Sequence, residues 1–321
     1  MGHAHSHSHG HGLHLAESAV LTRRITALSV AVASVLIGVK AVAWSMSGSV
    51  ALLASLADSG LDLAASLFTF FAVRYAAAPP DAEHRYGHGK AEAFASLVQA
   101  GLVFASAALV GREAVARLLD PRPVEQEPLV LAVMAVSIAL TLGLVVAQAR
   151  VLRRTASIAV HGDRAHYLAD LGGNAVVIAG VLGSWLLGWT ALDAVAGLLV
   201  AAWLVWGAVE VLRGSADQLM DHELPAEDRR RVLALMGEDP RISDVHQLRT
   251  RASGPVIHMQ MHVDLDPQMT LETAHAIVVA AERRVLAAFP AADILIHPDP
   301  RGRAEAHGGA FAELDPAQAG G

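Results

Sequence analysis

Six long apolar segments follow one another through the first two thirds of the chain. The hydrocarbon core of a bilayer needs roughly 20 apolar residues in a helix, so each segment is long enough to cross it. The pattern predicts six transmembrane helices, at about residues 24–46, 49–76, 90–118, 128–150, 159–187 and 190–212. Small residues are dense in the third and fifth segments, which permits close packing between helices in lipid.

Beyond Arg213 the pattern changes to that of a soluble domain. Two amphipathic stretches predict helices at residues 225–237 and 271–289, the second with Thr270 as its N-cap. Alternation of apolar and polar residues predicts three strands, at residues 245–253, 256–266 and 292–297. The order helix–strand–strand–helix–strand favours an α+β layer, in which the helices cover one face of a sheet.

These changes divide the chain into four expected parts: a His-rich disordered tail (1–20), a six-helix transmembrane domain (21–214), a cytoplasmic α+β domain (215–299) and a disordered tail (300–321). The first tail is polar and rich in small residues, a composition that buries no core. Its dense histidines bind zinc-like ions loosely when their imidazoles are neutral. An affinity tag and an inert tail remain alternative interpretations.

Composition supports a membrane protein. Hydrophobic residues make up 54% of the chain and the mean hydropathy is +0.42, too apolar for one soluble core. The net charge of −7, with no basic face, argues against a nucleic-acid partner. Because there is no cysteine, any metal must be held by His, Asp or Glu. The basic residues cluster in alternate loops, which predicts that both termini are cytoplasmic.

Two apolar segments carry charged or polar side chains near their middle. Asp58 and Asp62 lie four residues apart in the second segment, and His166 and Asp170 repeat that spacing in the fifth. A carboxylate at this depth costs at least ~2.5 kcal/mol, so it is rarely without a function. Side chains four apart share one helix face, and four N and O ligands from two helices suit a divalent cation. Polar groups that pack helices together, or a proton relay without metal, remain alternatives.

The loop after the second segment holds a second candidate metal site. Asp81, His84 and His88 follow an Asp-x-x-His-x-x-x-His spacing, and the two histidines share a face if the loop closes a helical turn. Three ligands of this kind are enough to hold an ion. A solvated polar loop is the alternative interpretation of the same spacing.

A third candidate group is dispersed over the soluble domain. It comprises His246, His262, His275, His297 and Asp299, from three predicted strands and one helix. Separation in sequence cannot show that these side chains converge. From composition alone, ordinary surface histidines are the simpler interpretation.

Taken together, five stretches resemble the cation diffusion facilitator family, in its bacterial zinc and ferrous-iron efflux branch. They are LADSGLD, DAEHRYGHGKAE, HYLADLGGN, HQLRTRASGP and ILIHPDP, and the resemblance runs from about Thr22 to Pro300. It implies a homodimeric antiporter of the bacterial inner membrane, which exports a cytoplasmic divalent metal in exchange for protons. It also implies a metallochaperone-like cytoplasmic domain.

The resemblance assigns roles to the candidate residues. Asp58, Asp62, His166 and Asp170 match the family's transport site, and Asp81, His84 and His88 match its loop site. The cytoplasmic residues match a binuclear regulatory site in which Asp299 bridges two ions, one held with His246 and His275, the other with His262 and His297.

Zn²⁺ is the expected cargo, because it suits a tetrahedral site of N and O ligands. Fe²⁺, Cd²⁺, Co²⁺ and Ni²⁺ remain open, whereas Mn²⁺ favours oxygen-rich octahedral sites. An enzyme is not expected, since the chain contains no His-Glu-x-x-His motif. A membrane metal sensor or buffer without transport would explain the histidines. It would leave the costly Asp58 and Asp62 without a purpose.

Overall fold

The computed structural model describes residues 15–47, 50–119, 128–187 and 192–302. These residues form two compact units, which divide between Met220 and Asp221. The His-rich tail lies outside the described residues up to residue 14, as does the C-terminal tail after residue 302. Residues 15–20, expected as part of the tail, are helical instead, because LAESAV consists largely of good helix formers.

The first unit consists of six long helices, which confirms the predicted fold class of the transmembrane part. Their bounds are α1 Leu15–Ser47, α2 Val50–Ala76, α3 Lys90–Leu119, α4 Pro128–Leu152, α5 Ile158–Leu187 and α6 Leu192–Leu219. Within their described residues, all but α5 are long and apolar enough to cross a membrane. In α5 the described residues include Asp163, Arg164 and Asp170, more charge than an ordinary lipid-facing span carries.

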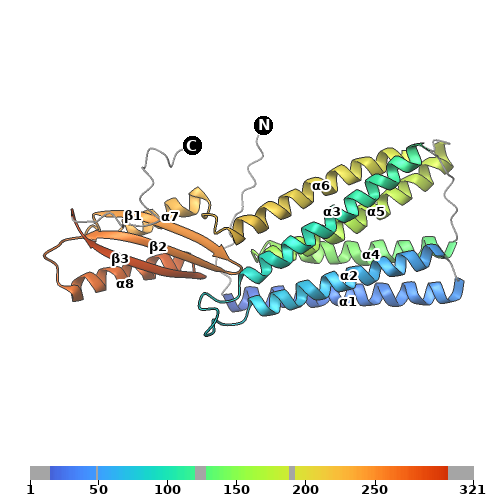
Figure 1. Ribbon diagram of the computed structural model, residues 1–321. Helices are drawn as coiled ribbons and strands as arrows, with labels where there is room; N and C mark the ends of the chain where they lie inside the picture. The colour runs from blue at the N-terminus through green and yellow to red at the C-terminus, as the bar shows by residue number, and fades with distance from the viewer. Residues whose placement is uncertain (1–14, 48–49, 120–127, 188–191, 303–321) are drawn as a thin grey trace. The chain divides into compact units, whose positions relative to one another are not determined.

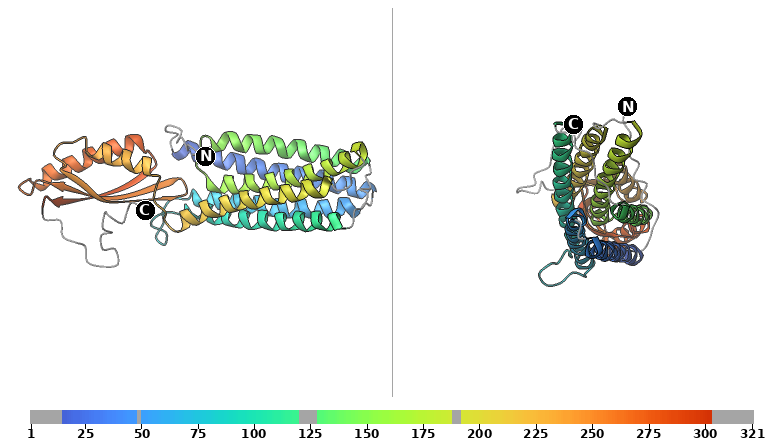
Figure 2. Two further views of the ribbon diagram at one scale, coloured as in Figure 1. Left: turned by 90° about the horizontal axis from the view of Figure 1, so that it is seen from above. Right: turned by 90° about the vertical axis from the view of Figure 1, so that its right-hand side faces the viewer.

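The helix α5 packs against two different sets of neighbours (Figures 1 and 2). Nearer its start it contributes Val160 and Tyr167 to an apolar cluster with α1 and α4. Further along, Ala169 packs with residues of α3 and α6. Small residues allow these approaches, since a Cβ at Gly162 would lie 2.8 Å from Ser96 Oγ of α3, and one at Gly172 would lie 2.9 Å from Val200 Cγ1 of α6. Helix α5 is therefore placed to join the two sets.

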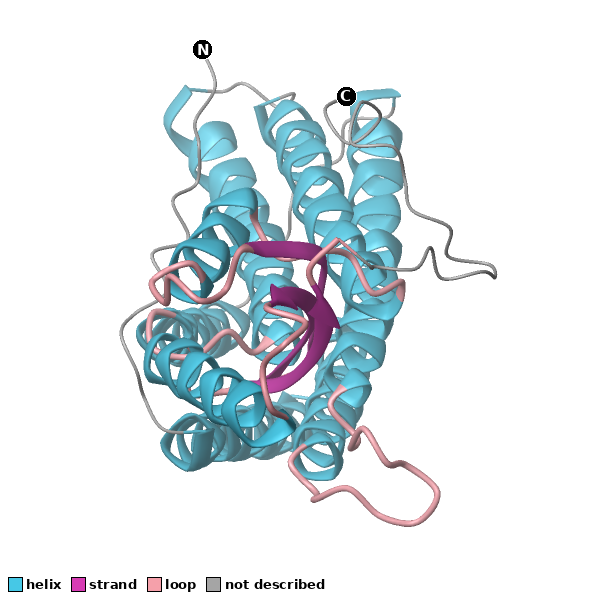
Figure 3. Cartoon of the chain, turned by 90° about the vertical axis from the view of Figure 1, so that its left-hand side faces the viewer, coloured by secondary structure: helices cyan, strands magenta, loops and turns pink. Residues whose placement is uncertain are grey.

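The second unit is a three-stranded sheet with two helices, as predicted (Figure 3). Its elements are α7 Ala226–Met236, β1 Asp244–Ser253, β2 Val256–Leu265, α8 Leu271–Ala288 and β3 Ala292–Pro300. The strand order is β1-β2-β3, antiparallel between β1 and β2 and parallel between β2 and β3. The predicted N-cap is confirmed, because the Thr270 side chain accepts a hydrogen bond from the backbone N–H of Thr273.

Alternation along β2 separates a core face from a polar face. Met259, Met261, Val263 and Leu265 are buried in one apolar cluster with residues of α7 and α8. The residues between them belong to the opposite face, because successive side chains on a strand point to opposite sides. Both helices therefore cover one face of the sheet, and the other face is left for polar chemistry.

Candidate metal centres

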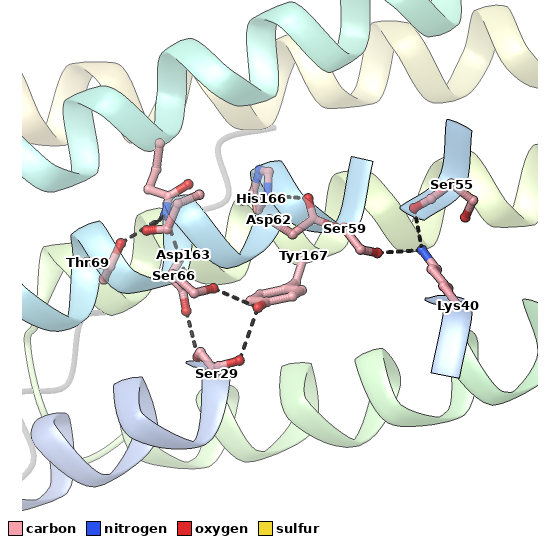
Figure 4. Close-up of polar contacts among 12 residues, drawn as sticks. Ser29, Lys40, Ser55, Ser59, Asp62, Ser66, Thr69, Asp163, His166 and Tyr167 are labelled. Atoms are coloured by element: carbon pink, nitrogen blue, oxygen red, sulfur yellow. Dashed lines mark hydrogen bonds and ion pairs between the residues drawn. The ribbon is translucent and has the colours of Figure 1, made fainter. Parts of the chain in front are cut away.

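The membrane unit brings three of the four expected transport ligands together. Asp62 of α2 and His166 and Asp170 of α5 each offer a ligand atom within 4.8 Å of the others. His166 Nε2 lies 3.0 Å from Asp62 Oδ1, and both residues are buried (Figure 4). The 3.0 Å distance is that of a hydrogen bond. Small movements of the three side chains would let their ligand atoms surround one ion.

Asp58, the fourth expected ligand, is exposed and lies outside that group. It is one helical turn from Asp62, a distance of about 6 Å along the axis. Ligands from α2 and α5 meet at the level of Asp62, so Asp58 needs a shift of side chain or helix to reach the same ion.

The loop between α2 and α3 also gathers its three candidate ligands. Asp81 Oδ1 lies 3.5 Å from His84 Nδ1, and Asp81 Oδ2 lies 3.2 Å from His88 Nε2. A tight turn brings them together, in place of the helical turn considered from the spacing, and Gly87 adopts φ 79° within it. The backbone N–H of His84, followed by that of Glu83, lowers the pKa of Asp81 by donating to its carboxylate. An ionised carboxylate beside two imidazoles is a suitable cation ligand.

On the polar face of the three-stranded sheet, three histidines form one row across the strands. His246, His262 and His297 are register partners on β1, β2 and β3. Asp299, two residues after His297, points to the same face. Its oxygens lie 2.8 Å from His262 Nδ1, 3.2 Å from His297 Nε2 and 3.7 Å from His246 Nε2. One carboxylate therefore lies within reach of all three imidazoles.

A local irregularity in β1 follows the first histidine of this row. The register with β2 shifts between His246 and Arg249, and Gln247 there adopts φ 50°. Such a bulge turns neighbouring side chains relative to the regular ladder, and bulges often occur beside functional sites. His275, the remaining expected ligand, is exposed on α8 and is not in the group formed by His246, His262 and Asp299.

Comparison with known proteins identifies the chain's relatives. Residues 26–220 match the family model of the cation efflux transmembrane domain, and residues 224–301 match that of the cation efflux protein cytoplasmic domain. The chain belongs to the cation diffusion facilitator family. It is 43% identical to a cation-efflux pump FieF of Shewanella oneidensis, over 85% of this chain and 92% of that protein.

A second relative of this cation diffusion facilitator carries the same name. The chain is 35% identical to a cation-efflux pump FieF of Klebsiella pneumoniae, over 87% of this chain and 93% of that protein. The metal-bound C-terminal domain of the CzcD transporter from Thermotoga maritima matches 25% of this chain and 93% of its own length, at 24% identity and TM-score 0.24. The family consists of transporters and not enzymes, so this chain is a multi-pass membrane protein of divalent metal efflux.

Two carboxylates that lie near these centres were not identified from the sequence. Asp264 Oδ1 lies 3.3 Å from His246 Nε2, on the polar face of the sheet. Alternation along β2 could have indicated it, because it lies two residues after His262. Asp163 of α5 is 1% exposed and accepts hydrogen bonds from side chains of three other helices. Its position three residues before His166, on the same face of α5, was the available signal.

Proposed function

We propose that this transporter exchanges cytoplasmic Zn²⁺ for protons across the bacterial inner membrane, with both termini in the cytoplasm and two copies of the chain acting together. The observation that supports the exchange best is the contact between His166 Nε2 and Asp62 Oδ1 at 3.0 Å. A hydrogen bond between an imidazole nitrogen and a carboxylate oxygen requires a proton between them. Both atoms are also metal ligands, so proton and metal compete for the same place.

The cycle follows from that competition. Zn²⁺ arriving from the cytoplasm displaces the proton between Asp62 and His166, and Asp170 supplies a further oxygen. Movement of α2 relative to α5 brings in Asp58 as the fourth ligand and opens the site to the opposite side of the membrane. Protons from that side then occupy His166 and the carboxylates, and the metal leaves.

Zn²⁺ is the proposed cargo because of the ligand types at this centre. One imidazole nitrogen and carboxylate oxygens in a small, buried group suit a four-coordinate ion. Replacing the imidazole with a carboxylate would create an oxygen-only site, which suits Mn²⁺ better. His166→Asp should therefore reduce discrimination between Zn²⁺ and Mn²⁺, measured as the ratio of their transport rates. An unchanged ratio would count against Zn²⁺ selection at this site.

Purified protein in liposomes provides the deciding experiment. A zinc-sensitive dye inside the vesicles reports Zn²⁺ entry while an imposed pH gradient is varied, and a second dye reports proton movement. We expect Zn²⁺ and proton fluxes in opposite directions, both lost in Asp170→Asn. A Zn²⁺ flux that does not change with the pH gradient would rule out antiport. Zn²⁺ binding without any flux would indicate a sensor or buffer. The same assay with Fe²⁺, Cd²⁺, Co²⁺ and Ni²⁺ ranks the alternative cargoes.

The cytoplasmic group is proposed as a regulatory metal site. His246, His262, His297 and Asp299 share the polar face of the sheet, with Asp299 in reach of three imidazoles. His275 would complete a second ion's ligand set after movement of α8. The loop site of Asp81, His84 and His88 would hold a further ion. Metal at these sites would favour the arrangement of paired cytoplasmic domains that transports, by binding that state more tightly.

A further inference from the structure

Asp163 is a buried carboxylate of the membrane unit that the proposed cycle does not use. Its Oδ2 accepts hydrogen bonds from Ser29 Oγ of α1 at 2.7 Å and from Gln148 Nε2 of α4 at 2.8 Å. Its Oδ1 lies 3.4 Å from Gln99 Nε2 of α3, a longer hydrogen bond. Figure 4 shows this carboxylate beside the His166–Asp62 pair. One side chain of α5 is thus bound to three other helices.

The same hydrogen-bond network reaches α2. Gln99 Nε2 donates to Thr69 Oγ1 at 2.8 Å, and it lies 3.3 Å from the carbonyl oxygen of Ala65. Beside it, the Tyr167 hydroxyl lies 2.7 Å from Ser66 Oγ and 3.3 Å from the Ser29 carbonyl oxygen (Figure 4). Five of the six membrane helices, α1 to α5, therefore meet at one polar cluster centred on Asp163.

This cluster lies between the metal ligands and one end of the bundle. On α5, Asp163 is nearer the helix start at Ile158 than His166 is, and on α2, Thr69 is nearer the helix end at Ala76 than Asp62 is. That end of the bundle is where α6 leads into the cytoplasmic domain. The Asp163 cluster thus separates Asp62 and His166 from the cytoplasmic end.

Toward the opposite end the helices diverge. The ribbons of α3, α5 and α6 run together and separate from those of α1 and α2 with distance from the cluster (Figure 1). On the cytoplasmic side of the metal ligands, two hydrogen bonds of the Asp163 cluster cross from one set to the other, from Ser29 of α1 to Asp163 of α5 and from Gln99 of α3 to Thr69 of α2.

Because Asp163 is buried, the cluster is favourable in two states only, one in which protein donors satisfy the carboxylate and one in which water does. A buried carboxylate is costly unless protein donors satisfy it, and Asp163 is 1% exposed with donors from α1, α3 and α4. If those helices separate at this level, the donors leave together and water must replace them. Intermediate separations leave the carboxylate unsatisfied and are unfavourable. Such an element is bistable, as a switching contact requires.

We propose that Asp163 and its partners Ser29, Gln99 and Gln148 form the cytoplasmic gate of the transport site. The hydrogen bonds hold α5 against α1, α3 and α4 when the site is closed to the cytoplasm, and they break when metal enters from there. Asp163 is a positioning residue, because it acts on access to Asp62 and His166 and does not touch the cargo. The inference rests on the proposed transport cycle.

Accessibility of a single thiol tests the gate without any transport. The natural chain has no cysteine, so Ser66→Cys places one thiol at a fully buried position of α2 between Asp62 and Thr69. A membrane-impermeant maleimide is applied in turn to the cytoplasmic and opposite sides of oriented vesicles. Adding Asp163→Ala should raise the cytoplasmic labelling rate at least tenfold and leave the opposite side unchanged. Asp163→Asn, which keeps an oxygen acceptor toward Ser29 and Gln148, should give an intermediate rate.

A matched control removes a buried carboxylate that does not cross between the two sets of helices. Glu92 of α3 is 5% exposed, and its Oε2 accepts a hydrogen bond from Ser157 Oγ, just before α5, at 2.6 Å. In the Ser66→Cys background, Glu92→Gln should leave the labelling rates unchanged. If it raises cytoplasmic labelling as much as Asp163→Ala does, general loosening explains both variants and the gate proposal is wrong.

Two further labelling results would also contradict the gate proposal. One is equal cytoplasmic labelling with and without Asp163→Ala, and the other is a rise on both sides of the membrane. If Asp163→Ala does not reach the membrane, Ser29→Ala and Gln148→Ala each remove one donor and should raise the cytoplasmic labelling rate severalfold. An unchanged labelling rate in both variants would contradict the gate proposal. Because labelling needs neither metal nor a proton gradient, failure of antiport and failure of the gate are separate results.

Discussion

The membrane site and the cytoplasmic site use the same chemical pair on different supports. His166 and Asp62 are 3.0 Å apart on two helices, and His262 and Asp299 are 2.8 Å apart on neighbouring strands of one sheet. Backbone hydrogen bonds fix the register of strands, whereas helices can slide and tilt relative to one another. Helices therefore suit a site that must open to two sides, and strands suit a site that only binds.

The two pairs also differ in how deeply their side chains are buried. In the membrane unit, the side chains of His166 and Asp62 are 6% and 10% exposed, and a second buried carboxylate, Asp163, lies between them and the start of α5. In the sheet, His262 and Asp299 are 18% and 12% exposed on a face that neither helix covers. The comparison predicts that substitutions in the membrane stop transport, and that substitutions in the sheet change metal affinity.

The largest expected effect is that of Asp62→Asn. The amide cannot supply an anionic oxygen, so the membrane site loses charge and its proton-linked ligand. Zn²⁺ flux into liposomes should fall at least 100-fold, while Zn²⁺ bound by the cytoplasmic domain, measured by equilibrium dialysis of the whole protein, stays the same. Flux above one tenth of the original rate would contradict the assigned role of Asp62.

The next effect is that of Asp299→Asn in the sheet. Asp299 is in reach of three imidazoles, so its loss should weaken Zn²⁺ binding at this site about 10- to 100-fold. Flux should fall only severalfold, because the membrane ligands are intact. The control is Asp293→Asn, whose carboxylate lies 3.1 Å from His258 Nδ1 and outside the group of His246, His262 and Asp299. Complete loss of flux in Asp299→Asn would erase the distinction between the two sites.

These two centres also show what a sequence can predict. The six helices, the α+β order and the pair His166–Asp170 follow from spacing along single elements, whereas His84 and His88 meet through a tight turn instead of the helical turn considered from their spacing. The position of Asp58 outside the ligand group does not, because it depends on the level at which α2 and α5 meet. The row of three histidines needed the register of the strands, which no spacing within one strand gives. Asp163 was passed over because its donors lie on α1, α3 and α4, and spacing along α5 does not show partners on other helices.

A smaller effect tests how much the turn between the first two strands contributes to the stability of the sheet. Gly254, in the turn between β1 and β2, adopts φ 57°, a conformation that costs other L-residues about 1–2 kcal/mol. Gly254→Ala should destabilise the cytoplasmic unit by about that amount, measured by denaturant unfolding followed by circular dichroism. Gly237→Ala is the matched control, since Gly237 has φ −73° and the added Cβ would make an ordinary contact, 3.5 Å from the Leu233 carbonyl oxygen. Equal losses in both variants would exclude backbone conformation as the cause.

The smallest expected effect is a pH-dependent one, away from both metal centres. Arg241 lowers the pKa of Asp239 to about 2, chiefly by hydrogen bonds from its side chain to the carboxylate, at 2.7 and 2.9 Å. A depressed pKa stabilises the fold above the unfolded-state pKa near ~3.9, and this contribution is lost as the pH falls toward 2. Since the Arg241 side chain is 55% exposed, solvent screening makes this contribution small. Asp239→Asn should therefore lower the unfolding free energy at pH 7, lower it less at pH 3, and leave Zn²⁺ affinity unchanged. A loss of the same size at both pH values would show that the carboxylate's charge is not responsible.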